Sequence, residues 1–330
     1  MEVKDTLIEG WQEVEAQLRL ILAGQSAMSA MGCGSLHLRL AKLLLWNDAL
    51  RQPPELWAER FEGAVETGLS GLWSVLEAQL DGRKPDFEGV RHLSLETRSA
   101  ALSEVDEGLV LDPGHRSLLR ARIVLCRALD DEAGTSSALR LLAHLPGLPE
   151  SMADALTDWG EHLWRALGDP AGAVQAFEQA LALFPEDLVL IDKVVKVDLE
   201  LERWVDAVAA CQHLIAALDK GHSKKELAVT YLLTLGEIHL QGLGAPGLAL
   251  GFYLEAVARL PTHALTFQLL GELFEGHHEE VKVAVEALWA HPSDDARRRH
   301  LAELLRGAVR HHPTSPRAAV KAFQGALEFI

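Results

Sequence analysis

The stretch GDPAGAVQAFEQALALFP, residues 168–185, decides the fold because it carries the start, the packing face and the end of one helix. Asp169 matches a helix N-cap, whose side chain accepts a hydrogen bond from the first turn, and Pro170 matches the first helical position. Pro185 ends the helix, since its ring excludes continuation. The stretch therefore predicts one helix of ordinary length with clear boundaries.

One face of this predicted helix suits contact with a second helix. Ala173, Phe177 and Ala180 follow one another at spacings of four and three residues, so they share a face. The alanines let a neighbouring helix approach closely, and the phenylalanine fills the space between the two. Residues 151–167 supply that neighbour, which predicts an antiparallel helical hairpin.

Similar series recur along the chain, the nearest of them about 34 residues further on. Each hairpin exposes an apolar flank that the next hairpin must cover, so the copies predict an array. Helical patterns fill almost every segment between short Gly, Pro or Asp breaks, and the sequence has no sustained strand alternation. The copies are Ala101, Val105, Gly108 and Pro113; Ala207, Cys211, Leu214 and Asp219; Ala249, Tyr253, Ala256 and Pro261; Ala284, Ala287 and Pro292; and Ala319, Phe323 and Ala326.

These residue types and spacings resemble the tetratricopeptide repeat (TPR) family, over roughly residues 96–330. Gly236 and Gly271 fall where the family has a glycine in the first helix of a repeat, and Trp164 and Phe274 take the aromatic position there. The opening stretch matches the second helix. The resemblance implies an all-α fold in which antiparallel hairpins stack into a TPR-like superhelix, an α-solenoid.

The sequence predicts two regions: an N-terminal helical cap region, residues 1–90, and a degenerate TPR-like repeat array, residues 91–330. The first region has no clear repeat. It either shields the first repeat, which we favour, or carries a separate partner-binding helix. Its expected features are an amphipathic helix with the stripe Leu7, Trp11, Val14, Leu18 and Ile21, a small-residue linker over 24–35, and helices over 36–46 and 56–80.

Composition narrows the class of protein and its partners. The 330 residues are 48% hydrophobic and 24% charged, which is typical of a folded, water-soluble chain. A formal net charge of -17 argues against nucleic acid and anionic membranes as partners. The N-terminus lacks the pattern of a secretory signal, and three widely spaced cysteines argue against a disulfide framework. We expect a cytoplasmic protein, and its rich use of Ala, Leu and Arg is typical of a bacterial one.

The search for chemistry leads us to expect no catalytic residue, metal or cofactor, and no enzyme. Cys33 lies between two glycines and is either an exposed reactive thiol or, as we favour, an incidental residue of the linker. Cys126 and Cys211 fall on apolar helical faces and are expected in the core. Adjacent histidines such as His277 and His278 point apart on a helix, which does not suit a zinc site.

The resemblance implies a concave groove lined by the first helix of each repeat. Six acids and two bases among its side chains imply a polar or basic peptide or protein partner. The alternative is that they are ordinary solvated positions. The carboxylate clamp of chaperone-binding relatives needs an asparagine, and the only one here, Asn47, lies outside the repeats. The implied groove residues are Asp158, His162, Arg165, Asp192, Lys196, Glu200, Leu233, Glu237, Gln268, Glu272 and Glu275.

The last predicted helix has an apolar face with no polar capping helix after it. Either this helix folds back onto the array, or the face binds another chain and makes a homo-oligomer. The residues of this face are Ala319, Phe323, Ala326, Leu327 and Phe329.

Taken together, these patterns predict a non-enzymatic protein–protein interaction adaptor or scaffold. The alternative is a regulatory module that senses a small ligand between repeats. An enzyme that uses the His-rich C-terminal third is the weakest of the three hypotheses.

Overall fold

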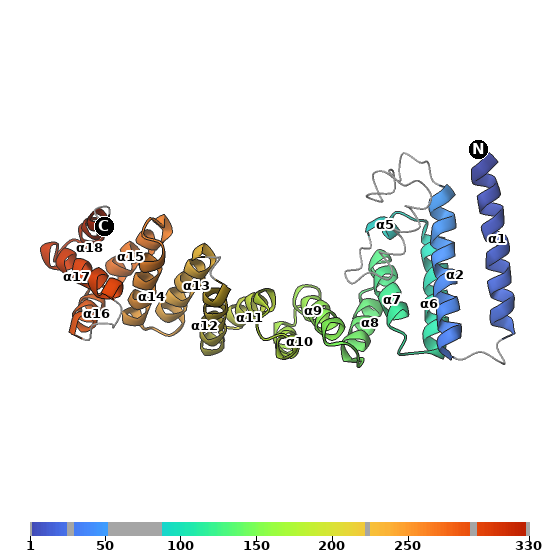
Figure 1. The fold of residues 1–330 in the computed structure, drawn as a ribbon, viewed down its shortest axis with the longest axis horizontal. Coiled ribbons are helices and arrows are strands. Elements are labelled where there is room, and N and C mark those ends of the chain that lie inside the picture. The colour runs from blue at the N-terminus through green and yellow to red at the C-terminus, as the bar shows by residue number, and fades with distance from the viewer. Residues whose placement is uncertain (1, 25–29, 52–87, 222–224, 291–295, 328–330) are drawn as a thin grey trace. The chain divides into compact units, whose positions relative to one another are not determined.

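The computed structural model describes residues 2–24, 30–51, 88–221, 225–290 and 296–327, and every regular element in these ranges is a helix (Figure 1). The predicted all-α class is confirmed. The helix predicted over 56–80 lies outside these ranges. The elements are α1 (Glu2–Ala23), α2 (Ala30–Arg51), α5 (Glu88–Arg91), α6 (Leu95–Leu111), α7 (Arg116–Ala128), α8 (Glu132–His144), α9 (Pro149–Arg165), α10 (Pro170–Leu183), α11 (Leu188–Glu200), α12 (Trp204–Gly221), α13 (Lys225–Glu237), the π-helix η2 (Ile238–Gly242), α14 (Pro246–Arg259), α15 (Ala264–Gly276), α16 (His278–Ala290), α17 (Ala296–His311) and α18 (Pro316–Leu327).

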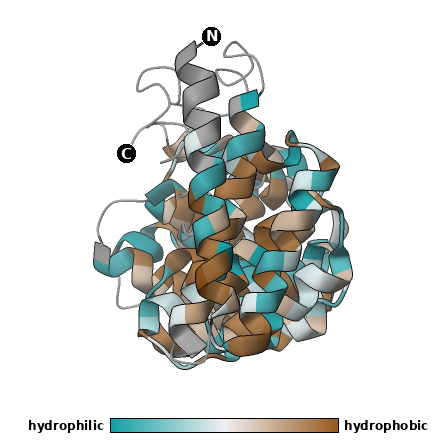
Figure 2. Cartoon of the chain, turned by 90° about the vertical axis from the view of Figure 1, so that its right-hand side faces the viewer, coloured by the Kyte–Doolittle hydropathy of each residue, from teal (hydrophilic) through white to brown (hydrophobic). Residues whose placement is uncertain are grey.

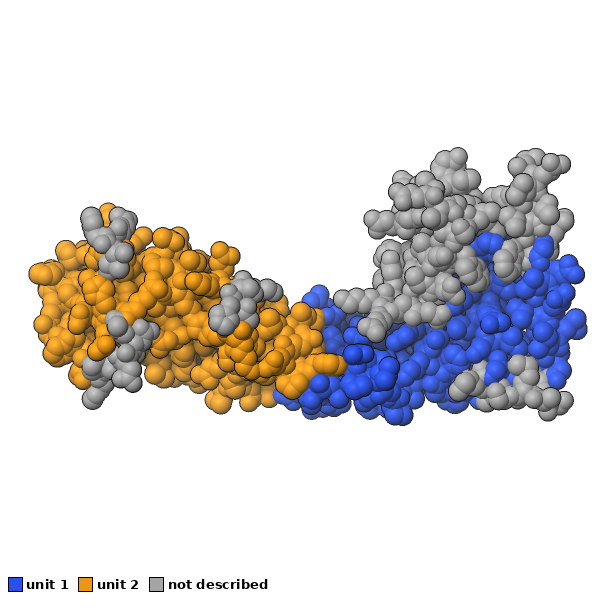
Figure 3. Space-filling model, viewed as in Figure 1, with its two compact units in different colours: residues 1–183 blue, residues 184–330 orange. Residues whose placement is uncertain are grey.

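The contacts divide the chain into two compact units, residues 1–183 and 184–330 (Figure 3). In the first, α2 packs against α6, and each helix from α6 to α10 packs against the next. In the second, α11 pairs with α12 and α13 with α14. Figure 2 shows hydrophobic and hydrophilic residues on the same helices. Stacked hairpins, as in an α-solenoid, are thus present within each unit, and the domain boundary at residue 90 stays a prediction.

The hairpin of α9 and α10 confirms the prediction from the opening stretch. The Asp169 carboxylate accepts a hydrogen bond from the Gly172 amide at 2.9 Å, and the helix starts at Pro170. Ala173, Phe177 and Ala180 are all fully buried. The Phe177 ring lies against the backbone of Gly160 on α9, where an added Cβ would come within 2.5 Å of the ring. Glycine is required there because the ring occupies the space of a side chain.

The same ring-on-glycine contact recurs in the second unit. The buried Tyr253 ring of α14 lies on Gly236 of α13, so a Cβ at Gly236 would clash with it. Tyr253 follows Gly236 by the same number of residues as Phe177 follows Gly160. Gly271, the other glycine that the resemblance placed in a first helix, differs: an added Cβ would meet nothing within 4 Å. Its α15 has no equivalent aromatic partner, because Leu288 stands at that position of α16.

The linker predicted over 24–35 is wrong for its second half, which is helical. Helix α2 already begins at Ala30, and Cys33 is buried, with 4% exposure. Its small neighbours allow close helix packing: a Cβ at Gly34 would come within 3.3 Å of the Leu118 side chain on α7. The interpretation of Cys33 as an exposed or linker thiol is therefore wrong. On α1, Leu18 and Leu22 contact the Cys33 side of α2.

The end of the chain folds back onto the second unit. Helix α18 packs against α17 and also against α15, where the rings of Phe323 and Phe267 are 6.3 Å apart. Phe323 is fully buried and Ala319 nearly so. These two side chains therefore belong to the core, as in the first of the two predicted alternatives, and are not free to bind a second chain. Ala326 and Leu327 are half-buried, and Phe329 lies outside the described residues.

One repeat copy has a different register from the predicted one. On α16 the buried residues are Val281 and Val285, whereas Ala287 is exposed. The larger valine side chains gain more from burial than alanine does, and this difference sets the face that packs against α14 and α17.

Two glycine substitutions test the ring-on-glycine contact. We expect Gly236→Ala to destabilise the protein by about 1–3 kcal/mol, because the methyl group overpacks the buried Tyr253 ring. Gly271→Ala should instead stabilise it by up to about 1 kcal/mol, since space is open there and alanine favours helix. Urea unfolding followed by circular dichroism measures both, and equal effects would contradict the assignment.

The burial of Phe323 is testable in the same way. Phe323→Asp should cost at least about 3 kcal/mol of unfolding free energy, because it removes a core ring and buries a charge. The exposed neighbour Gln324→Asp is the matched control and should change little. A Phe323→Asp protein with wild-type stability but a smaller mass by light scattering would show that the residue serves self-association instead.

Candidate functional site

The implied groove residues are distributed over both units. Asp158, His162 and Arg165 lie on α9 in the first unit, and the other eight lie on helices of the second. The second set falls on α11, α13 and α15, the first helices of successive hairpins, and comprises Asp192, Lys196, Glu200, Leu233, Glu237, Gln268, Glu272 and Glu275.

His162 is not a groove residue, which corrects the prediction. The side chain is buried and shares a hydrogen bond of 2.7 Å between Nε2 and the Ser136 hydroxyl on α8. Burial lowers the pKa of His162, although the nearby Glu132 carboxylate opposes this shift. The packing of α9 against α8 turns this position inward, so His162 joins two helices instead of facing a ligand.

Leu233, which is predicted to line the groove, lies in the core instead. It is 4% exposed and belongs to the apolar face of α13, together with Val229 and Leu232. A leucine at this place gains more from burial in the core than from lining a groove.

Asp192 and Lys196 form a local network on α11. The Asp192 carboxylate accepts hydrogen bonds from the Lys196 ammonium, at 2.7 Å, and from the Tyr231 hydroxyl on α13. Burial raises the pKa of Tyr231, and the Asp192 hydrogen bond raises it further. Asp192 thus joins α11 to α13 through Tyr231, and the charges of Asp192 and Lys196 neutralise each other.

Glu237 and Glu272 form an acidic pair across α13 and α15. Both side chains are exposed, and Gln268 donates a hydrogen bond of 2.9 Å to the Glu272 carboxylate. Partial burial raises the pKa of Glu237, and the negative charge of Glu272 raises it further. The two carboxylates repel each other, so a cationic group placed beside them would relieve that repulsion.

Three of the implied residues line a real groove. An open groove of about 510 Å³ lies between α15 and α18, and Gln268, Glu272 and Glu275 form its α15 wall. Arg317 and Lys321 of α18 stand opposite, and the Arg317 guanidinium is paired with the Glu275 carboxylate. These two bases are not among the groove residues that the sequence predicts, because no repeat pattern indicates that α18 packs against α15.

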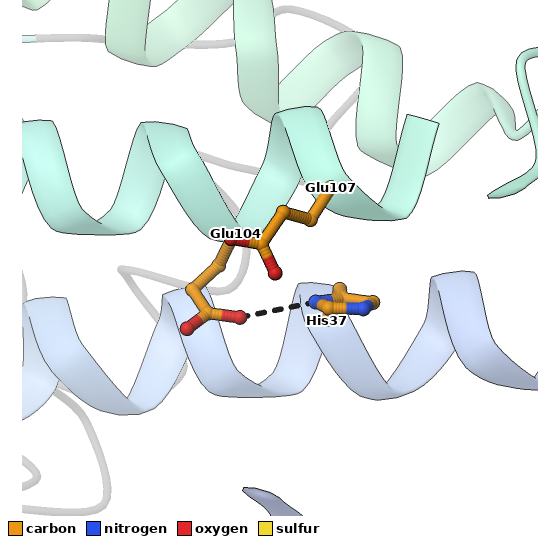
Figure 4. A group of neighbouring side chains, drawn as sticks. All are labelled: His37, Glu104 and Glu107. Atoms are coloured by element: carbon orange, nitrogen blue, oxygen red, sulfur yellow. Dashed lines mark hydrogen bonds and ion pairs between the residues drawn. The ribbon is translucent and has the colours of Figure 1, made fainter. Parts of the chain in front are cut away.

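A second polar cluster lies in the first unit. His37 on α2 and Glu104 and Glu107 on α6 offer donor atoms that all lie within 4.8 Å of one another (Figure 4). No other group of three such side chains meets this geometry in the part of the chain that is described. His37 Nδ1 is 3.0 Å from Glu104 Oε2, while Arg19 of α1 donates to Glu104 Oε1 at 2.7 Å.

This second cluster is better suited to joining helices than to holding a cation. Arg19 places a positive charge on the one buried carboxylate, which weakens its attraction for a metal ion. The network connects α1, α2 and α6. A polar residue inside an apolar stripe, such as Glu104 between Ala101 and Val105, is the signal that could have found it.

The remaining cysteines are structural, as expected. Cys126 and Cys211 are free and buried, and burial raises the pKa of each thiol to about 12. A thiol with such a pKa is not a nucleophile at neutral pH.

Comparisons with known proteins found similarity among solved structures only. No protein-family model matches the chain, and no curated protein sequence matches it. Among solved structures it is similar to PilW, a widely conserved type IV pilus biogenesis factor, with a TM-score of 0.34 and 16% identity over 62% of this chain and 91% of PilW. It is also similar to the APC/C hetero-tetramer Cut9–Hcn1, with a TM-score of 0.33 and 15% identity over 89% of this chain and 52% of that one.

The acidic pair gives a pH-dependent prediction. Folding raises the pKa of Glu237, so ionisation of this carboxyl group lowers the free energy of unfolding. This loss is absent below the ordinary pKa of 4.5 and develops as the pH rises through the raised pKa. We expect Glu237→Gln to raise the melting temperature at pH 7 and the gain to vanish toward pH 4. Glu226→Gln, on the same helix, is the control and should give no gain. A gain independent of pH would contradict the acidic pair.

Within each unit, the packing reproduces the features on which the TPR resemblance rests: antiparallel hairpins, small residues at their contacts and an aromatic ring of the second helix on a glycine of the first. The chain is thus a protein of stacked helical hairpins that resemble those of TPR proteins.

Proposed function

We propose that the protein is a non-enzymatic adaptor that binds a polar or basic peptide on the α13 and α15 faces of its second unit. The observation that carries the proposal is the acidic pair of Glu237 and Glu272: partial burial raises the pKa of Glu237, and the negative charge of Glu272 raises it further. A lysine or arginine of a partner, placed between the two carboxylates, would be attracted by both of them. Its positive charge would also offset the repulsion between the carboxylates.

The surface around the pair supports a peptide rather than an isolated cation. Glu272 also lines the groove between α15 and α18, together with Gln268, Gln324 and Lys321. Amide side chains can both donate and accept hydrogen bonds, so they suit a peptide backbone. Stacked hairpins hold such side chains on preformed helices, which lowers the entropic cost of binding.

The cellular setting is also part of the proposal. No described helix combines the length and the apolar character that a membrane span needs. The three cysteines are unpaired and buried, which agrees with a reducing compartment. On the ground of these cysteines, we include a cytoplasmic location in the proposal.

A charge-reversal experiment tests the surface. The probe is a fluorescein-labelled peptide of alternating lysine and glycine, titrated with the protein while fluorescence anisotropy is recorded. We expect the double variant Glu237→Lys/Glu272→Lys to weaken binding at least roughly tenfold, because two attractive charges become repulsive.

The matched control changes the net charge equally at other places. Asp154→Lys/Glu303→Lys alters two exposed acids on α9 and α17. This control should bind the peptide nearly as wild type does. Equal weakening in both double variants would mean that the peptide senses only the overall charge of -17, and the proposed surface would be rejected.

A further inference from the structure

A separate cavity lies in the second unit between α14 and α17. Its volume is about 330 Å³, at the lower end of the roughly 300–1,000 Å³ typical of small-molecule sites. Phe252 and Leu254 come from α14, Leu301 from α17 and Leu288 from α16. The cavity shares no lining residue with the groove between α15 and α18.

The apolar part of the cavity is left unfilled by the protein's own side chains. Gly251 stands in the α14 wall, and a Cβ added there would meet nothing within 4 Å. Leu254 and Leu301 are buried beside this space, while Leu248 is exposed at its edge. An apolar ligand group of suitable size would gain the free energy of leaving water, about 25 cal/mol per Å² of buried apolar surface.

Of the two arginines on the cavity wall, one has no ion pair within the described residues. Glu255 is already paired with Arg259 at 2.9 Å and with Arg298 at 3.0 Å. Arg299 also lines the cavity, is exposed and has no ion pair or hydrogen bond with any residue in the described ranges. Elsewhere on α17, Arg306 pairs with Glu286 and lies over the Trp289 ring. Among the described residues, the cavity thus combines an apolar lining with a guanidinium that has no ion pair.

We propose that this cavity binds a small amphiphilic carboxylate, such as a medium-chain fatty acid. The tail lies against Phe252 and Leu301, and the carboxylate pairs with the Arg299 guanidinium. Arginine suits this head group because its planar fork can donate two hydrogen bonds to one carboxylate. The site is distinct from the proposed peptide surface on α13 and α15, so either can be correct without the other.

Octanoate is the probe, titrated into the full chain by isothermal calorimetry, with octylamine and octanol as comparators of equal tail length. We expect octanoate to bind with one-to-one stoichiometry and octylamine to bind at least roughly tenfold more weakly, since its ammonium faces Arg299. Arg299→Glu should weaken octanoate to a similar extent. Arg297→Glu, two residues away and outside the cavity lining, is the matched control and should bind as wild type does.

A cavity-filling variant separates loss of binding from loss of fold. Gly251→Leu places a side chain in the open space, and leucine favours helix more than glycine does. It should abolish octanoate binding while the melting temperature stays equal or rises. Octanoate binding that survives Gly251→Leu, or equal affinity for octylamine, would overturn the proposal. The proposal would also be overturned if octanoate did not bind. The same holds if only an acidic, leucine-containing peptide bound in the cavity.

Discussion

The contact between a buried aromatic ring and a bare glycine backbone is the constraint on which the hairpins depend. Phe177 on Gly160 and Tyr253 on Gly236 each bring two helices closer than ordinary side chains permit. Such a contact buries a large apolar surface and demands a glycine at one place only, so the rest of the hairpin can vary. Hairpins can therefore stack although the other residues of the repeat series differ from copy to copy.

Where this contact is missing, the helices pack differently. Helix α15 has open space at Gly271, and its apolar face is covered by the returning α18 through Phe267 and Phe323. The proposed peptide groove, between α15 and α18, and the proposed carboxylate cavity, lined by α14, α16 and α17, both lie in the second unit. Less regular packing leaves hollows between helices, and hollows are where ligands bind.

Charge is organised differently in the two units. In the first, Glu104 is buried and satisfied by His37 and Arg19, because an unpaired buried carboxylate is too costly. In the second, Glu237 and Glu272 stay exposed and repel each other. The first arrangement stabilises the packing of three helices, whereas the second stores an unfavourable interaction that a cationic partner can remove.

The residues by themselves determined the helices, the hairpin around Phe177 and the predominance of acids on the first helices, because caps and helical faces depend on neighbours three or four positions away. Only the tertiary structure decided that His162 points to Ser136, that Leu233 is core and that Arg317 stands opposite Glu275. Those placements depend on which helices meet, and such contacts join residues far apart in the chain, where no local spacing records them.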